Sequence, residues 1–525
     1  MKKRTKSGKG IKMEKMRENF KFFGGMAIMY AVIFTFSLYR NFTGVTFPFY
    51  VLATILFAVL FLKKLGQSIK LKTYFYFVGM FLLGIATMMT ASGFFHFFNW
   101  VGISLLFMSA MIHQWNDDRK WGFPTHLKNF FVLIGRNVIS VIAPFVHCFY
   151  YVKGENQDVS ITSDVQQSGD VVKVGKKRRV KRKILPVLLG LGLSLVSLVI
   201  VLPLLLSSDM VFEQLFRNIF ASINFIDVFG VLFTFGFAFI VFYGFFAAME
   251  RGSMKGPKEG EKRKADAVIG ITFTMSLAVV YLIYSVIQIL FLFLRFEGGL
   301  PEHVTYSQYA HSGFWQLLAV SIINFVLVLI CIRVFRESKV LKALLCMISF
   351  CTCIMTVSAA YRMLLYVGAY NLSFLRVLVL WFLAVLTLIM VGVMIYIFKT
   401  KFGLFQYIVV VVACAYIIFS FARVDYIIAG YNIEQNVRNE DAMPLDVHYL
   451  TRWLSVDAAP AIARLQVSDL NSNKMQDIED RESFEAGVKS SIDRYFEQIL
   501  EQENTGRRWN FSRHLAQKAA QAYLE

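Results

Sequence analysis

The chain has 525 residues, of which 57% are apolar and 17% are charged, and 53 are phenylalanine. A water-soluble fold needs more polar surface than this composition supplies, so we exclude a soluble globular protein. The formal net charge of +20 does not indicate nucleic-acid binding, because the basic residues cluster at 2–21, 176–183 and 251–264, beside apolar stretches. Such clusters are typical of the cytoplasmic flanks of membrane helices, where they attract anionic lipids.

The apolar residues form runs long enough to cross a bilayer, which takes roughly 20 residues as a helix. A helix also satisfies every backbone amide within its own segment, as lipid requires. The sequence therefore predicts an all-α fold: a polytopic transmembrane helix bundle of about eleven spans with a small helical C-terminal extramembrane domain. We expect the spans at 22–39, 45–62, 74–90, 93–112, 184–206, 225–249, 267–294, 314–335, 340–359, 374–398 and 403–421.

Residues 1–21 are basic and too polar to insert, so they are expected to form a cytoplasmic tail. The segment 22–39 is interpreted as a retained first helix rather than a removed signal peptide. The Lys and Arg counts then alternate with each crossing, from 9 in the tail to 1 at Arg40 and 4 in 63–72. By the positive-inside rule the N-terminus is cytoplasmic, and an odd number of spans puts the chain after Arg423 outside.

Residues 22–112 are expected to form a four-helix N-terminal membrane part, and residues 184–421 a seven-helix membrane core. The region 113–183 between them carries a cytoplasmic amphipathic segment and a basic linker. Within it, 127–151 is apolar but interrupted by polar residues and a proline. We interpret this segment as an amphipathic helix on the cytoplasmic surface, with a spanning or re-entrant segment as the alternative. Residues 152–183 read as a flexible linker.

Residues 422–525 change character and are predicted to be a helical extramembrane domain. Apolar residues at every third or fourth position predict one helix over 483–503, and a second is expected after Asn510. Asp446 and Asp457 are expected to cap two earlier helices. The domain is too small for a large core of its own, so we expect it to lean on the outer ends of the bundle. The inward positions of the second helix are expected to be Leu515, Ala519 and Tyr523.

Few polar side chains lie within the predicted spans. The neutral ones, Asn99, Gln288 and Asn324, are expected to hydrogen-bond between helices. The ionisable ones, His96 and Asp227, are candidates for function because desolvation makes a charge inside a bilayer costly. Both lie near the predicted outer edge of the membrane.

The densest polar patch near the membrane lies between residues 361 and 376. Arg362, Tyr366 and Tyr370 are four positions apart and share one face of a helix, with Arg376 as a second clamp. A cation beside two phenols can bind a phosphate or a carboxylate, so these four residues are a candidate anion or ligand patch. The alternative is an interfacial anchor, because Tyr and Arg favour the headgroup zone.

No catalytic, metal or cofactor site is predicted. The sequence contains no phosphate-cradling Gly-Lys-Ser/Thr loop, no GxSxG elbow and no HExxH motif. The six cysteines lie in or beside apolar segments, which favours buried apolar residues over a disulfide framework. The histidines fit neither a haem-binding pattern nor a zinc site. Beyond the lipid bilayer and its anionic lipids, the sequence identifies no partner.

Four blocks of residues carry a resemblance to a known family: Tyr361–Arg376, Tyr306–Trp315, Asp425–Ile433 and Tyr449–Ala461. They resemble conserved blocks of a bacterial multi-pass membrane family known only as domain of unknown function 4153/4173. The resemblance covers roughly residues 184–525 and implies a protein of the bacterial plasma membrane. The resemblance also implies a candidate structural or functional motif, which consists of Asp425, Tyr431, Asn432 and Asp457.

The sequence departs from that family pattern at Asn371, where glycine is expected. The resemblance implies no reaction. We expect a non-enzymatic component of the cell envelope that is sensory, regulatory or a scaffold. The alternative is a transporter or lipid-handling protein that binds an anionic group at the outer membrane face, and a membrane-embedded enzyme has the least support.

Overall fold

The computed structural model describes residues 14–116, 121–151, 201–219, 225–250, 265–290, 306–399, 401–438, 445–466 and 478–525, with a few single residues between these ranges. The described residues form helices and no β-strand, which confirms the predicted all-α fold. Ten long helices are α2 (Phe20–Leu38), α3 (Thr46–Lys64), α4 (Leu71–Met89), α5 (Gly93–Trp115), α10 (Phe225–Glu250), α11 (Ala267–Gln288), α12 (Tyr306–Val334), α13 (Lys339–Tyr370), α14 (Phe374–Phe398) and α15 (Leu404–Phe421).

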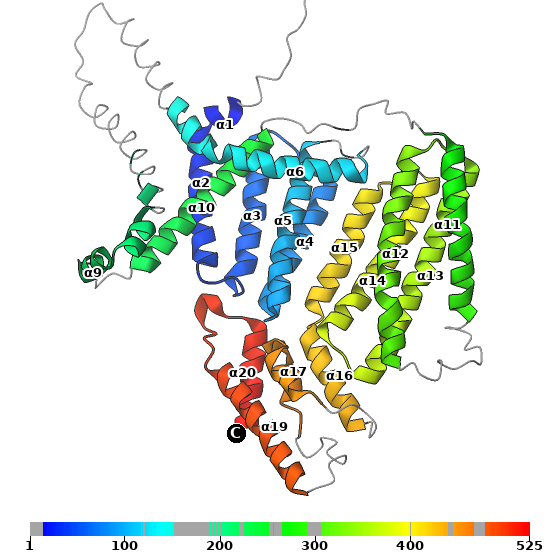
Figure 1. Ribbon diagram of the computed structural model, residues 1–525. Coiled ribbons are helices and arrows are strands. Elements are labelled where there is room, and N and C mark those ends of the chain that lie inside the picture. The colour runs from blue at the N-terminus through cyan, green and yellow to red at the C-terminus, as the bar shows by residue number, and fades with distance from the viewer. Residues whose placement is uncertain are drawn as a thin grey trace, which may run out of the picture.

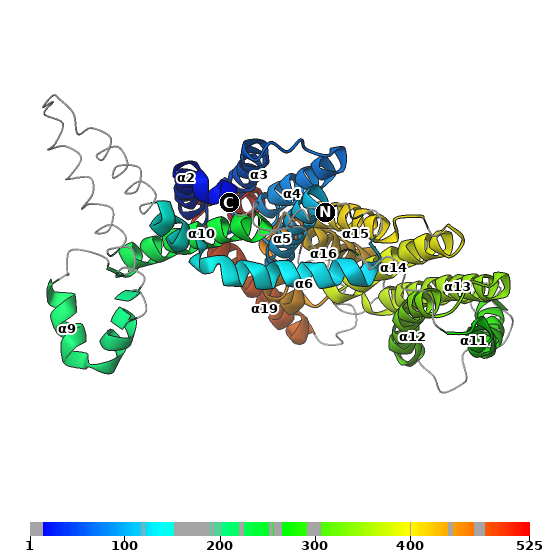
Figure 2. The ribbon, with the colours of Figure 1, turned by 90° about the horizontal axis from the view of Figure 1, so that it is seen from above.

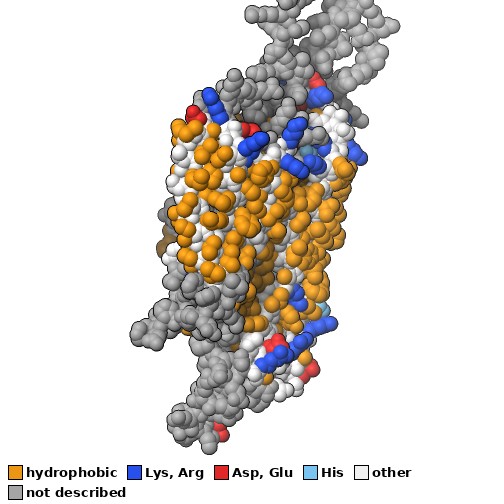
Figure 3. Space-filling view, turned by 90° about the vertical axis from the view of Figure 1, so that its right-hand side faces the viewer, with side chains coloured by type: hydrophobic (Ala, Val, Ile, Leu, Met, Phe, Trp, Pro, Cys, Tyr) orange, Lys and Arg blue, Asp and Glu red, His pale blue; other side chains and the backbone are white. Residues whose placement is uncertain are grey.

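Each of these ten helices contains a segment long and apolar enough to cross a membrane, and Thr125–Tyr151 is an eleventh candidate by length and composition. The protein is therefore a multi-pass membrane protein. Ten of the predicted spans coincide with these helices, whereas most of the predicted span 184–206 lies outside the described residues. Figure 3 shows the expected belt of hydrophobic side chains, with lysine and arginine gathered at its two ends.

The eleventh candidate lies differently from the other ten. Its first part is α6 (Phe123–Ile139), which runs across the ends of the upright helices in Figure 1 and over them in Figure 2. Leu127, Phe131, Ile134 and Val138 recur along one side of α6 and are all exposed. An amphipathic helix in this attitude lies along a membrane surface with its apolar side in the lipid. The location of α6 on a membrane surface stays a prediction, with a spanning or re-entrant segment as its alternative.

The last span, α15, lies between two groups of helices (Figure 1). One group contains α2 to α5 together with α10, which packs against α2, and the other contains α11 to α13, which α14 joins. α15 packs against α14 on one side and against α4 and α5 on the other. The helix α15, which follows the other spans in the sequence, therefore connects the N-terminal group of helices with the group that contains α14.

Polar side chains inside the bundle pair between helices, as predicted. The Oδ1 of Asn99 accepts hydrogen bonds from the hydroxyls of Tyr416 and Ser420, both at 2.9 Å. Its Nδ2 donates to Thr87 at 3.1 Å, so one amide connects α4, α5 and α15. Asn324 donates to the Thr352 hydroxyl at 2.9 Å and thereby connects α12 with α13.

The two ionisable candidates are also paired. Asp227 on α10 forms a 2.6 Å ion pair with Arg40 and accepts a hydrogen bond from the hydroxyl of Tyr39. Both partners lie on the connection between α2 and α3. The Nε2 of His96, in the first turn of α5, lies 2.8 Å from the carbonyl oxygen of Thr90 in the α4–α5 connection. Both contacts are of the kind that holds helix ends in place.

The C-terminal helices lie at the end of the bundle opposite α6 (Figure 1). Val488, Ile492, Tyr495 and Ile499 are buried along α19, which confirms the predicted apolar stripe. The prediction for α20 is confirmed in part. Tyr523 packs against the core, with its ring 4.6 Å from that of Phe496, but Leu515 and Ala519 are only half-buried, and the fully buried positions are Ser512, Ala516 and Ala520. The elements are α16 (Val424–Arg438), α17 (Val447–Arg452), η4 (Val456–Ala458), α18 (Ala459–Ile462), α19 (Ile478–Leu500) and α20 (Phe511–Leu524).

Buried polar groups tie this domain to the bundle. Asp446 caps α17 as predicted, by accepting from the Tyr449 amide at 2.8 Å. The predicted cap by Asp457 is wrong, because Ser455 caps η4 and the Asp457 carboxylate faces the membrane helices instead. It accepts from the Thr90 hydroxyl at 2.5 Å and the Ala91 amide at 2.7 Å, and also from the Ser512 hydroxyl.

Asn510 makes a second tie at the start of α20. Its Oδ1 caps α20 by accepting from the amides of Ser512 and Arg513, at 3.0 and 3.2 Å. Its Nδ2 donates to the carbonyls of Thr43 and Thr90, at 3.0 and 2.9 Å. One completely buried amide therefore joins the C-terminal domain to the α2–α3 and α4–α5 connections.

Replacing Asp457 with alanine should loosen this docking, because three donors, two of them in buried hydrogen bonds, lose their carboxyl acceptor. We expect a loss of about 3 kcal/mol in the free energy of unfolding, with faster hydrogen exchange in η4, α18 and α20. Glu503→Ala is the control, since its ion pair with Arg508 is on the surface, and it should cost under about 0.5 kcal/mol. Equal effects of the two variants would contradict the docking role.

Candidate functional site

The predicted ligand patch lies on the two helices that flank the α13–α14 turn. α13 ends at Tyr370 and α14 begins at Phe374, so three residues reverse the chain. Asn371 has φ 64° and ψ 174°, a conformation that costs a residue with a Cβ about 1–3 kcal/mol. A glycine, which the resemblance leads us to expect at this position, would adopt this conformation without that cost. With asparagine there, the turn needs outside contacts to hold its shape.

Arg376 folds back over the end of α13. Its Nη1 donates to the carbonyls of Tyr370, at 2.6 Å, and Asn371. The last carbonyls of a helix have no partner within the helix and carry partial negative charge, so a cation is favourable there. The guanidinium also lies over the ring of Tyr366, 4.3 Å from its centre, and that ring packs against Tyr370.

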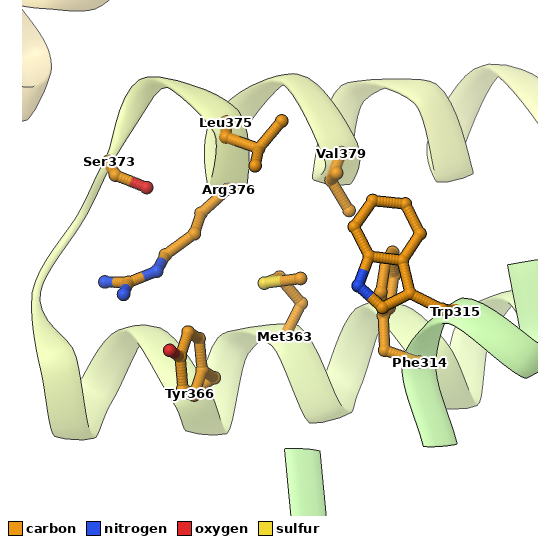
Figure 4. A pocket seen from close by; sticks show the side chains of 8 residues that line it. All are labelled: Phe314, Trp315, Met363, Tyr366, Ser373, Leu375, Arg376 and Val379. Atoms are coloured by element: carbon orange, nitrogen blue, oxygen red, sulfur yellow. The ribbon is translucent and has the colours of Figure 1, made fainter. Parts of the chain in front are cut away.

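A cavity of about 210 Å³ opens beside this guanidinium. Figure 4 shows Arg376 at one end of it, close to Ser373 and Tyr366, while Phe314 and Trp315 form the other end. The side chains come from α12, α13 and α14, and that of Ser373 from the α13–α14 turn. The cavity therefore combines one cation and one phenol with a wall of apolar and aromatic groups.

A second cavity, of about 730 Å³, lies between the two groups of membrane helices. Its walls come from α4, α5, α12, α14 and α15, with α6 closing one end, and they are almost entirely apolar. Val379 lines both cavities. On α14 the sequence from Arg376 through Val379 to Phe382 runs from the cationic cavity into the apolar one. We call the first the headgroup pocket and the second the apolar groove.

The four patch residues do not all meet. Tyr366 and Arg376 line the headgroup pocket, and Tyr370 supports it through its ring and its carbonyl. Arg362 is buried and faces α11, where its Nη2 donates to the Gln288 side chain at 3.2 Å. Gln288 also accepts from Ser358 at 2.5 Å, which confirms its predicted role between helices. Arg362 is therefore part of an interhelical contact.

The pocket also contains residues that the patch prediction missed. Trp315 and Phe314 come from α12, more than forty positions earlier in the chain. They belong to the family block Tyr306–Trp315, which was the available signal. Their place in the same cavity as Arg376 follows from the packing of α12 on α13, which spacing in the sequence does not reveal.

The family motif residues connect the C-terminal domain to the bundle. The Asn432 amide accepts from the Leu372 N–H at 2.8 Å and donates to the Leu372 carbonyl at 2.9 Å. Asp425 is buried and accepts from the Ser455 amide and hydroxyl, at 3.1 and 2.6 Å. Tyr431 is half-buried on the same helix. Together with Asp457, these contacts determine how α16 and η4 meet the ends of the membrane helices.

Among the described residues, no group of three or more His, Cys, Asp or Glu side chains is placed to hold a metal ion. The family model described as Domain of unknown function (DUF4153) matches residues 77–465. The resemblance noted in the sequence covers roughly residues 184–525, so the matched region begins and ends earlier in the chain. It includes the residues that line both cavities and all four motif residues. No curated protein and no solved structure gives a match.

The buried carboxyl of Asp425 makes the docking of the C-terminal domain sensitive to pH. Burial, reinforced by the nearby Asp457 carboxylate, raises the pKa of Asp425 above its ordinary value of 3.8. The folded protein thus binds this proton more readily than the unfolded chain. The contribution of Asp425 to stability therefore rises as the pH falls through its folded pKa, and levels off below the unfolded value.

Asp425→Asn should remove this dependence. Thermal unfolding of both proteins in detergent, followed from neutral pH down to pH 4, measures the difference. We expect the wild type to gain stability relative to the variant as the pH falls. A constant difference across that range would show that Asp425 keeps an ordinary pKa.

Proposed function

The chain belongs to the family of the domain of unknown function DUF4153, and we propose that it is a non-enzymatic lipid-handling protein that holds an anionic membrane lipid. One observation carries the proposal. The headgroup pocket beside Arg376 and the apolar groove share Val379 and adjoin along α14. A cationic pocket that continues into an apolar groove complements a molecule with an anionic head and a long apolar tail.

The chemistry of the pocket suits such a head. A guanidinium offers five N–H donors in a plane, and the two bonds to the end of α13 both use Nη1. The remaining donors are available to a phosphate or carboxylate oxygen, with the Tyr366 hydroxyl nearby. The apolar groove supplies the larger, apolar part of the site, which would hold the lipid tail. Sites of this kind, mostly apolar with a few convergent polar groups, are where small molecules usually bind.

We also propose an orientation in a bacterial plasma membrane, with the N-terminus in the cytoplasm and the C-terminal domain outside. Lys70 donates to the carbonyls of His113 and Asn116, at 2.6 and 2.9 Å, so two basic connections share one end of the bundle with α6. The C-terminal domain is at the other end. The positive-inside rule assigns the basic end to the cytoplasm, where anionic lipids attract it.

The same orientation puts the headgroup pocket near the outer face. The α13–α14 turn, which immediately precedes the helix that carries Arg376, contacts the C-terminal domain, and this domain lies at the end away from α6. The sensory, regulatory or scaffold role expected from the sequence stays a prediction. It is compatible with lipid binding, since a bound lipid is one signal that such a protein can report.

Cysteine labelling tests the orientation. In a cysteine-free background, Trp453→Cys replaces a side chain that is 74% exposed on the C-terminal domain, and Lys64→Cys lies at the basic end. A membrane-impermeant maleimide should label Trp453→Cys in intact cells and Lys64→Cys only after permeabilisation. The reverse pattern would invert the topology, and labelling of both positions in intact cells would refute the span count.

Lipid binding to the purified protein tests the function. Native mass spectrometry in detergent should show tighter binding of phosphatidylglycerol than of phosphatidylethanolamine. Arg376→Gln should lower the phosphatidylglycerol affinity about tenfold, because a charge-assisted hydrogen bond is lost, while Arg438→Gln, on the exposed face of α16, should not. Inorganic phosphate should not displace the lipid, because phosphate cannot fill the groove.

A groove variant separates the two parts of the site. Val412→Phe adds bulk inside the groove and leaves the α13–α14 turn unchanged, so it should weaken both lipids alike. Ile418→Phe is the matched control, because Ile418 is 71% exposed on the same helix and does not line the groove. Equal affinity for the two lipids in the wild type, together with no effect of Arg376→Gln, would refute the proposal.

A further inference from the structure

The C-terminal domain holds the α13–α14 turn at two points. The Asn432 side chain satisfies both backbone groups of Leu372, in the way that a neighbouring strand would. The Tyr449 hydroxyl accepts from the Phe374 amide at 2.9 Å, at the first residue of α14. These bonds lie on either side of Ser373, which lines the headgroup pocket. Both ends of the short turn are therefore fastened to the domain.

This turn needs fastening. Asn371, next to Leu372, has a positive φ that its side chain disfavours, so the conformation persists only where its surroundings impose it. The carbonyl of Asn371 is also one of the two that receive Nη1 of Arg376. A change in the turn would consequently move the acceptor that orients the guanidinium.

The same domain holds the opposite wall of the groove. Phe94 and Phe98 line the groove from the first turns of α5. The connection that precedes α5 is held by Asp457, through Thr90 and Ala91, as described above. One extramembrane domain therefore contacts the headgroup side and the facing helix.

We infer that Asn432 and Tyr449 are positioning residues for Arg376, through which the C-terminal domain determines the affinity of the headgroup pocket for an anionic lipid head. This inference rests on the proposed function, and it assigns to two residues of the extramembrane domain a part in ligand selection. Neither residue lines the pocket. Both act through the backbone of the turn.

The test uses the full-length protein in detergent and two readouts. The first is hydrogen exchange of the peptide that contains the α13–α14 turn, where the Leu372 amide is protected by Asn432. The second is the ratio of affinities for phosphatidylglycerol and phosphatidylethanolamine. A general loss of stability lowers both affinities, whereas a displaced Arg376 lowers their ratio. The variants are Asn432→Ala and Tyr449→Phe, with Glu434→Ala, an exposed residue of α16, as the control.

We expect Asn432→Ala to speed exchange in the turn and to lower the affinity ratio about fivefold, the value of one hydrogen bond. Tyr449→Phe should act in the same direction, and Glu434→Ala should change neither readout. In an Arg376→Gln background, Asn432→Ala should have almost no further effect on the ratio, because both act through one group.

Two results would overturn the inference. Faster exchange in the turn with an unchanged affinity ratio would show that the turn does not control Arg376. Additive losses in the double variant would show that Asn432 acts by another route. If the wild type binds neither lipid, the proposed function fails, and the exchange measurement alone still decides whether Asn432 holds the turn.

Discussion

The hydrocarbon interior of a bilayer contains no water to satisfy a backbone N–H or carbonyl, and this constraint governs the whole structure. It explains why the membrane part consists of long helices, since each helix satisfies its own backbone. It also explains why Asn99, Gln288 and Asn324 pair with side chains of other helices. The same constraint applies where the chain turns at the end of the bundle, because the backbone N–H and carbonyl groups of each turn have no partner within a helix.

The C-terminal domain supplies many of those partners. Asn510 donates hydrogen bonds to carbonyls of the α2–α3 and α4–α5 connections. Asp457 accepts from the Ala91 amide, and Asn432 pairs with both backbone groups of Leu372. Three short polar side chains thus complete three different turns. The domain gains its own stability from the same contacts, because its apolar core continues into the bundle end at Phe95 and Phe419.

The features that follow from composition and local periodicity were predictable from the sequence. Apolar length identified the spans, and spacing of four identified the face shared by Tyr366 and Tyr370. Features that depend on packing between distant segments were not. Arg362 has the same spacing as the two tyrosines but turns toward Gln288. The pairing of Asp457 with Thr90, the register of α20 and the position of α15 between the two helix groups depend on partners that no local pattern specifies.

The position of α15 has a consequence for biogenesis. Asn99 on α5 is synthesised 317 residues before Tyr416 and 321 residues before Ser420, the two partners that its amide finds on α15. Until α15 has been synthesised, the Asn99 side chain lacks these two hydrogen-bond donors while α4 and α5 are in the membrane or beside the insertion machinery. The bundle closes only after α15 has been synthesised, so a chain truncated before α15 leaves the sides of α4 and α5 that α15 covers without their partner helix.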